Sequence, residues 1–105
     1  MSKYYGMFVN LGDPMNRWKL DEVVRITSLI KEYADKHNLK DVELLEVEDN
    51  RWEDEVNQRI DVEIVYPDTK GIMIQQKLLI LKGEILDGKE FHKRAEEFYP
   101  RKAGK

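Results

Sequence analysis

The chain has 105 residues, of which 41% are hydrophobic and 37% charged, with a net charge of −3 at pH 7. This length suits one domain, which we place over residues 1–105, and it excludes a second large core. The absence of cysteine excludes disulfides, thiolate metal sites and a cysteine nucleophile. No apolar run reaches the ~20 residues that cross a bilayer. We see no signal-peptide pattern either, and therefore expect a cytoplasmic protein.

The first half of the chain predicts one strand and one long helix. Residues 3–11 alternate in a way typical of a strand. Residues 21–37 carry apolar side chains at three- to four-residue spacing, which predicts a helix with one solvated face. Asp21 or Asp13 is the expected N-cap, and Asn38 marks the end of this helix.

The second half predicts three strands and a shorter helix. Strands are expected at 41–47, 58–66 and 72–82, with a charged loop at 48–57, and Leu44-Leu45 interrupts the alternation of the first. The sequence Pro67-Asp68-Thr69-Lys70-Gly71 predicts a turn that joins the last two strands in a hairpin. Residues 83–88 suggest a short strand extension and a break. Asp87 then caps a helix over 89–99, and a basic tail follows at 101–105.

These segments predict an α+β fold of two layers, in the order β-α-β-β-β-α. We expect a mostly antiparallel sheet with the long helix packed on one face. The stretch from Leu78 to Leu81 is apolar on both faces of its strand. Either both faces are covered within the chain, or one face is buried against a second copy, which favours a homodimer through the 72–81 strand.

The charge is distributed unevenly: residues 1–40 carry +2, residues 41–68 carry −9 and residues 69–105 carry +4. The acidic block contains Trp52, which we expect to be exposed, and Arg51, and this composition is found in interface hot spots. We therefore predict a partner-binding surface formed by Glu46, Glu48, Asp49, Arg51, Trp52, Glu53, Asp54 and Glu55. The competing interpretation is a solvated loop that protects a sheet edge, with Trp52 folded back onto the sheet and Arg51 paired locally. A calcium loop is excluded, because Arg51 occupies a ligand position and the turn glycine is missing.

No standard catalytic or cofactor motif occurs, so we predict no cofactor, no metal and no catalytic residues. The alternative hypothesis is a metal-dependent phosphodiesterase that uses Asp61, Glu63, Asp68 and Lys77. Pro67-Asp68 followed by Gln75-Gln76-Lys77 resembles the motif of restriction-type nucleases. It departs from that motif because Gln75 stands where a carboxylate is expected, and because Asp68 lies in a turn.

Nucleic-acid binding is the third hypothesis, since the C-terminal third is basic. The acidic pI of about 5.4 argues against it. The length, charge blocks and missing motifs are typical of small accessory proteins of the phage type. This is a likeness of type, and no site residue is transferred from it. The sequence thus favours a small non-enzymatic regulatory protein that binds a protein partner through residues 46–55, and nucleic-acid-binding proteins are included among the expected partners.

Overall fold

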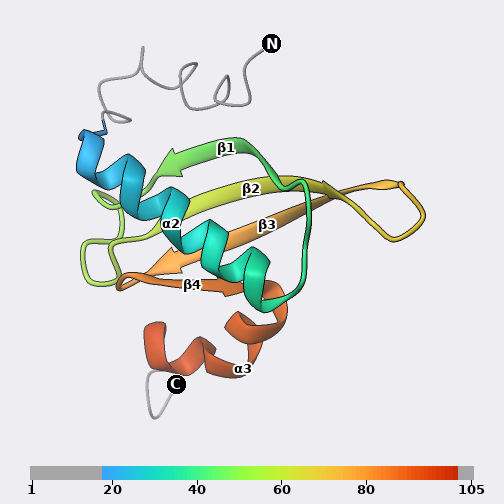
Figure 1. Cartoon of the computed structure of the whole chain (residues 1–105). Helices are drawn as coiled ribbons and strands as arrows, with labels where there is room; N and C mark the ends of the chain where they lie inside the picture. Colours follow the sequence, from blue (N-terminus) through green and yellow to red (C-terminus); the bar gives the residue numbers. More distant parts are fainter. Residues whose placement is uncertain (1–17, 102–105) are drawn as a thin grey trace.

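The computed structural model describes residues 18–101. These form a four-stranded antiparallel sheet, with one helix before the first strand and one after the last (Figure 1). The strands follow one another in space as β1-β2-β3-β4. The elements are α2 Leu20–Lys36, β1 Glu43–Asp49, β2 Ile60–Pro67, β3 Met73–Leu81, β4 Glu84–Asp87 and α3 Gly88–Phe98. The predicted α+β class is confirmed. The strand predicted at 3–11 and residues 102–105 of the predicted tail lie outside the described residues.

The start of helix α2 differs from the prediction. The N-cap is Lys19 and not Asp21, and the Lys19 backbone N–H donates to Glu22 Oε1 at 2.9 Å. Glu22 at the third helical position thus satisfies a backbone group at the helix start, the arrangement of half a capping box. The helix ends as expected, because Asn38 adopts a φ of 61° that turns the chain out of the helix.

Strand β1 contains a β-bulge where the sequence broke its alternation. The pairing with β2 shifts between Leu44 and Glu46, so Leu45 is the extra residue. Leu44 and Val47, three residues apart, therefore both pack against the core under α2. The strand also continues to Asp49, two residues past its predicted end, and β2 begins two residues later than predicted, so the loop between them keeps its length and shifts to residues 50–59.

Two tight turns define the rest of the sheet. The β2–β3 turn forms as predicted, with Asp68 Oδ1 accepting from the backbone N–H groups of Lys70 and Ile72 at 2.8 and 2.9 Å. Lys82 and Gly83 both have positive φ, 51° and 81°, in a two-residue hairpin turn. This turn makes residues 84–87 a complete fourth strand, where the sequence indicated only an extension.

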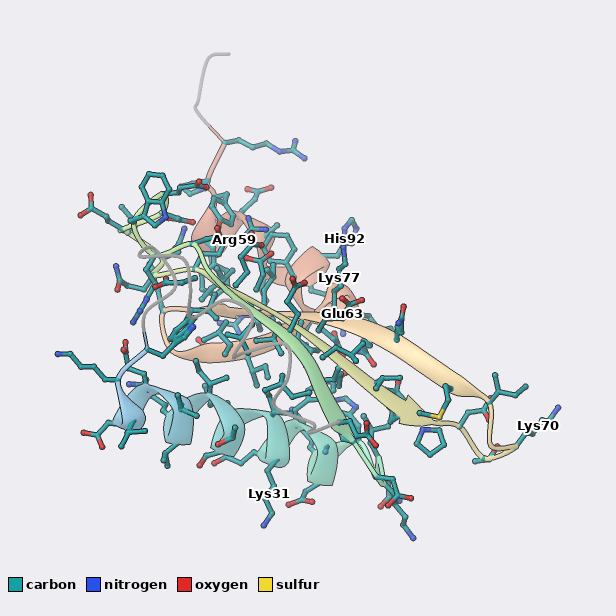
Figure 2. All side chains as sticks on the ribbon, turned by 90° about the horizontal axis from the view of Figure 1, so that it is seen from above. Lys31, Arg59, Glu63, Lys70, Lys77 and His92 are labelled. Carbon is teal, nitrogen blue, oxygen red and sulfur yellow. The ribbon has the colours of Figure 1, made fainter. Side chains whose placement is uncertain are left out.

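Apolar side chains fill both faces of the C-terminal half of β3, residues 78–81. Nine buried residues pack between α2 and the sheet: Ile26, Ile30, Tyr33, Val47, Ile60, Val62, Ile64, Leu78 and Ile80. A smaller cluster on the opposite face joins α3 to the sheet: Leu81, Leu86 and Phe98, with Leu79 and Phe91 at its margin. Figure 2 shows α2 and α3 on opposite sides of the sheet. The apolar stretch 78–81 is thus buried within one chain and does not itself require a second copy.

Candidate functional site

The side of the sheet away from α2 is only partly covered, and it forms a groove with α3. The groove has a volume of about 360 Å³. Figure 2 shows Arg59, Glu63 and Lys77 on this side of the sheet, with His92 of α3 beyond them. We call it the acidic groove and define it by four carboxylates, two basic residues and an apolar floor: Glu46, Glu48, Asp61 and Glu63; Arg59 and Lys77; Leu79, Leu86 and Phe91.

The strand register places the four carboxylates in two directly opposed pairs. Glu46 of β1 lies opposite Glu63 of β2, and Glu48 lies opposite Asp61. The bulge at Leu45 is what turns Glu46 and Glu48 to this face, because without it the alternation from Leu44 would direct them towards α2. Like charges directly opposite each other destabilise an antiparallel pair. The concentrated negative charge in the groove therefore lowers the stability of the unbound protein.

Asp61 is the carboxylate whose charge the protein balances. It accepts hydrogen bonds from Arg59 Nε at 2.8 Å and Nη2 at 3.0 Å, and from Asn50 Nδ2 at 2.8 Å. Burial by itself would raise the pKa of Asp61, but these hydrogen bonds outweigh burial and hold the pKa below its usual value. Asp61 therefore stays ionised, and its hydrogen-bond acceptors are already occupied within the chain.

Glu46 and Glu63 are the groove carboxylates that remain free to bind a ligand. Lys77 lies opposite Glu63 in the β2–β3 ladder, but within residues 18–101 neither Glu63 nor Glu46 forms an ion pair or a side-chain hydrogen bond. Beside them Leu79 and Phe91 are half-buried and supply apolar surface. The groove thus combines two carboxylates that form no ion pair within residues 18–101 with an apolar floor.

A second hollow of about 560 Å³ continues the acidic groove towards the loop between β1 and β2. It shares Glu48, Arg59 and Asp61 with the groove. The loop adds Glu53 and Asp54 to its lining. The negative surface therefore runs from the loop across β1 and β2 to the start of α3.

The predicted binding segment divides among three places. Glu46, Glu48, Glu53 and Asp54 line the acidic groove or its continuation. Trp52 is 55% exposed on the loop, and Glu53 and Glu55 are exposed beside it. Asp49 and Arg51 lie on the side of α2.

Arg51 binds within the chain, as the competing interpretation predicted, but Trp52 stays exposed and does not fold back onto the sheet. Its guanidinium donates to Asp49 at 2.8 Å, forms an ion pair with Glu22, and stacks over the Trp18 ring at 4.8 Å. The hydrogen bonds with Asp49 raise the pKa of Arg51, while burial opposes this rise. These contacts fasten the loop to the start of α2, so Arg51 and Asp49 have a structural role.

Asp54 also holds the loop in place. Its carboxylate accepts from the backbone and side chain of Asn57 and from the Tyr99 hydroxyl. The hydrogen bond from Tyr99, together with those from Asn57, lowers the pKa of Asp54. Asn57 is buried and also donates to the Phe98 carbonyl at 3.1 Å. The loop is thus fixed to the end of α3, which stabilises the shape of the second hollow.

Asp61 and Glu63 were assigned by sequence to the phosphodiesterase hypothesis and not to the partner-binding surface. The structure brings them beside Glu46 and Glu48 instead. Their outward position could be predicted from the alternation of β2. Their proximity to the acidic segment depends on the pairing of β1 with β2, for which the sequence carries no local signal.

Only three of the four residues of the phosphodiesterase hypothesis come together. Asp61, Glu63 and Lys77 share the acidic groove, whereas Asp68 is held in the hairpin turn by Lys70 and Ile72. In the described part of the chain, no three histidine, aspartate or glutamate side chains are placed to hold one metal ion. The donor set does not fit a metal centre there.

The basic residues of the C-terminal third do not form one surface either. Arg94 pairs with Glu84 and Glu97 at 2.7 and 2.9 Å, and Arg101 lies 3.8 Å from Glu96. Lys70 is at the tip of the β2–β3 hairpin, far from Lys77 (Figure 2). Nothing in this arrangement favours a continuous track for a nucleic-acid backbone.

Comparisons with known proteins give no further guide to function. No protein-family model, no curated protein and no solved structure matches the chain. Within residues 18–101, neither helix combines the length and the apolar character that crossing a bilayer demands. The cytoplasmic location stays a prediction.

Proposed function

We propose that this protein is a non-enzymatic interaction protein that binds a basic segment of a partner protein in the acidic groove. One observation carries this proposal: Glu46 faces Glu63, and Glu48 faces Asp61, across paired strands. A lysine or arginine side chain of a partner placed between Glu46 and Glu63 would relieve their repulsion. Binding of a cationic side chain should therefore release more free energy here than on a surface with scattered carboxylates.

The groove also favours a particular kind of basic segment. Leu79 and Phe91 form part of its floor and offer apolar contact. A segment that alternates basic and apolar side chains would meet both the carboxylates and this floor. Trp52, exposed on the loop that borders the second hollow, supplies a further anchor for the same partner.

The charge of residues 41–68 supports fast association with such a partner. Their net charge of −9 attracts a positively charged protein at long range, and salt weakens this attraction. Proteins that bind nucleic acids carry basic surfaces with complementary charge, and we include them in the proposed class of partners. Occupation of such a surface would regulate the partner by excluding its nucleic acid.

The direct test is fluorescence anisotropy with a labelled peptide of alternating lysine and leucine residues, titrated at low and at high salt. The double variant Glu46→Gln/Glu63→Gln should weaken binding about tenfold or more, the effect of losing ~1.4 kcal/mol. The control Glu32→Gln/Asp35→Asn changes the net charge equally on the exposed face of α2 and should leave binding within about twofold.

Two results would contradict the proposal. Equal weakening by both double variants would show that net charge, and not the groove, binds the peptide. Absence of saturable binding at low salt would show that the groove takes no basic segment. A partner captured from a lysate would support the proposal only if the wild-type protein retains it and the Glu46→Gln/Glu63→Gln variant releases it.

A further inference from the structure

The two long edges of the sheet are protected to different degrees. The outer edge of β1 contains a bulge at Leu45 and carries several carboxylates, both of which discourage pairing with another chain. Strand β4 covers β3 only along 78–81. Residues 73–77 of β3 therefore have a strand neighbour on one side only within the described chain. We call residues 73–77 the open edge.

The hairpin tip that precedes the open edge projects away from both helices (Figure 2), whereas Gln76, near the other end of the open edge, donates a hydrogen bond to Tyr33 of α2. Figure 1 shows the β2–β3 hairpin extending beyond the rest of the sheet, and Figure 2 places Lys70 at its tip, far from Lys31 of α2 and His92 of α3. Apolar side chains are exposed along this projection: Ile72 at 62%, Met73 at 55% and Ile74 at 37%. An exposed apolar strand with unpaired backbone groups is a ready template for another strand.

The turn geometry identifies which backbone groups of the open edge have no strand partner among residues 18–101. The Asp68 N–H donates to the Ile72 carbonyl at 2.8 Å, so the backbone of Ile72 is directed towards β2. Backbone direction alternates along a strand, which turns the N–H and C=O groups of Met73 and Gln75 away from β2. Pro67, which has no N–H to donate, lies opposite Met73, as this alternation requires.

We propose that the chain forms a symmetric dimer in which the open edge pairs antiparallel with the same segment of a second copy. The two-fold axis passes at Gln75, so Gln75 faces Gln75 of the second copy and Met73 faces its Lys77. In this register Gln75 exchanges backbone hydrogen bonds with Gln75 of the second copy, and Met73 exchanges them with Lys77 of the second copy. The proposal retains the predicted dimer strand but confines its contact to residues 73–77.

The side chains of the open edge are compatible with pairing to a second copy of the same segment. Lys77 is the only charged residue of the segment, and self-pairing places it opposite Met73, so the two lysines do not face each other. The segment contains no proline, glycine or bulge that would prevent continuous pairing. A five-residue ladder buries little surface, and we therefore expect a weak, concentration-dependent dimer.

The dimer would also arrange the acidic grooves. The two-fold axis of an antiparallel strand pair is perpendicular to the sheet, so both grooves would lie on one side of a continuous sheet. A partner with two basic segments would then bind both grooves with a gain in apparent affinity. This consequence rests on the proposed function, whereas the dimer itself does not.

Sedimentation velocity over a concentration series into the millimolar range tests the dimer without any ligand. The wild-type protein should move from monomer to dimer as concentration rises. Gln75→Pro removes an N–H that points away from β2, so it should abolish the dimer and preserve the fold. Far-UV circular dichroism and thermal unfolding at low concentration check that the fold is intact.

A matched pair of substitutions at Met73 tests the register. Met73→Lys places two positive charges opposite each other at both ends of the paired segment and should weaken the dimer about tenfold or more. Met73→Glu removes the same apolar side chain but faces Lys77 with an opposite charge, so it should dimerise more tightly than Met73→Lys. The difference should shrink at high salt.

Each contrary result overturns a stated part of the proposal. A wild-type protein that remains monomeric throughout the series overturns the dimer, as does a dimer that persists in folded Gln75→Pro. Equal dimerisation of Met73→Lys and Met73→Glu overturns the register. Peptide binding by a strictly monomeric protein would leave the acidic groove supported and reject the dimer alone.

Discussion

The two faces of the sheet are built from the same strands and differ in what they contribute. On the α2 face, β2 and β3 present Ile60, Ile64 and Leu78 to a continuous apolar core. On the other face, α3 covers the β3–β4 side, and carboxylates occupy the β1–β2 side. One face therefore supplies stability by burial, whereas half of the other carries a repulsive charge array that stability alone does not explain.

Asp87 joins the two faces. Its Oδ2 accepts from the Tyr33 hydroxyl of α2 at 2.8 Å, and its Oδ1 accepts from the Glu90 backbone N–H at 2.7 Å, which caps α3. Tyr33 in turn accepts from Gln76 at 2.8 Å. Burial and then the hydrogen bond with Asp87 raise the pKa of Tyr33 to about 12. The position of α3, and with it one wall of the groove, depends on this network.

The largest predicted effect is on the α2 face. Ile64 is fully buried, and Ile64→Ala should lower the free energy of unfolding by about 2–5 kcal/mol, because it removes apolar contacts and leaves a cavity. Urea denaturation measures the change. The same substitution at exposed Ile72 should cost less than about 0.5 kcal/mol. Similar losses at the two positions would contradict the contrast between core and projection.

An intermediate effect is predicted where the faces are joined. Asp87→Ala should destabilise the protein by about 1–2 kcal/mol at pH 7, because α3 loses its cap and the Tyr33 hydroxyl loses its acceptor. Asp35→Ala, on the exposed side of α2, serves as the control and should stay within about 0.5 kcal/mol. Urea denaturation of both variants gives the comparison.

The pH dependence of the same substitution sharpens this test. The backbone hydrogen bond from Glu90 lowers the pKa of Asp87 in the folded protein. Its contribution is therefore present above its unfolded pKa of about 3.9, and it is lost as pH falls through the lower folded value. The difference in stability between the wild type and Asp87→Ala should accordingly shrink in acid. A difference that stays constant down to about pH 2 would mean that the carboxylate charge contributes nothing.

The smallest predicted effect, and one of opposite sign, is in the acidic groove. Glu63→Gln should raise the free energy of unfolding by about 0.2–1 kcal/mol, because it removes a charge opposite Glu46. The gain should diminish at high salt, and Glu32→Gln on α2 should show none. Loss of stability in Glu63→Gln would mean that Lys77 already balances this carboxylate.

Local features of the fold followed directly from the sequence. The alternation of 60–66 fixed which side chains of β2 face the core, and Pro67 to Gly71 specified the hairpin turn. Asp87 was predicted as the cap of α3 and forms that hydrogen bond. These predictions succeed because each depends on neighbours within a few residues, through backbone geometry or side chain to backbone hydrogen bonds.

The composition of the acidic groove depended on the tertiary structure. The bulge at Leu45 and the register of β1 against β2 bring Glu46 beside Glu63, although 17 positions separate them. The same structure withdraws Arg51 from the predicted surface and binds it to Asp49 and Glu22. A two-residue period determines which side chains share a face of one strand, but the neighbouring strand and its offset are set by packing across the whole sheet.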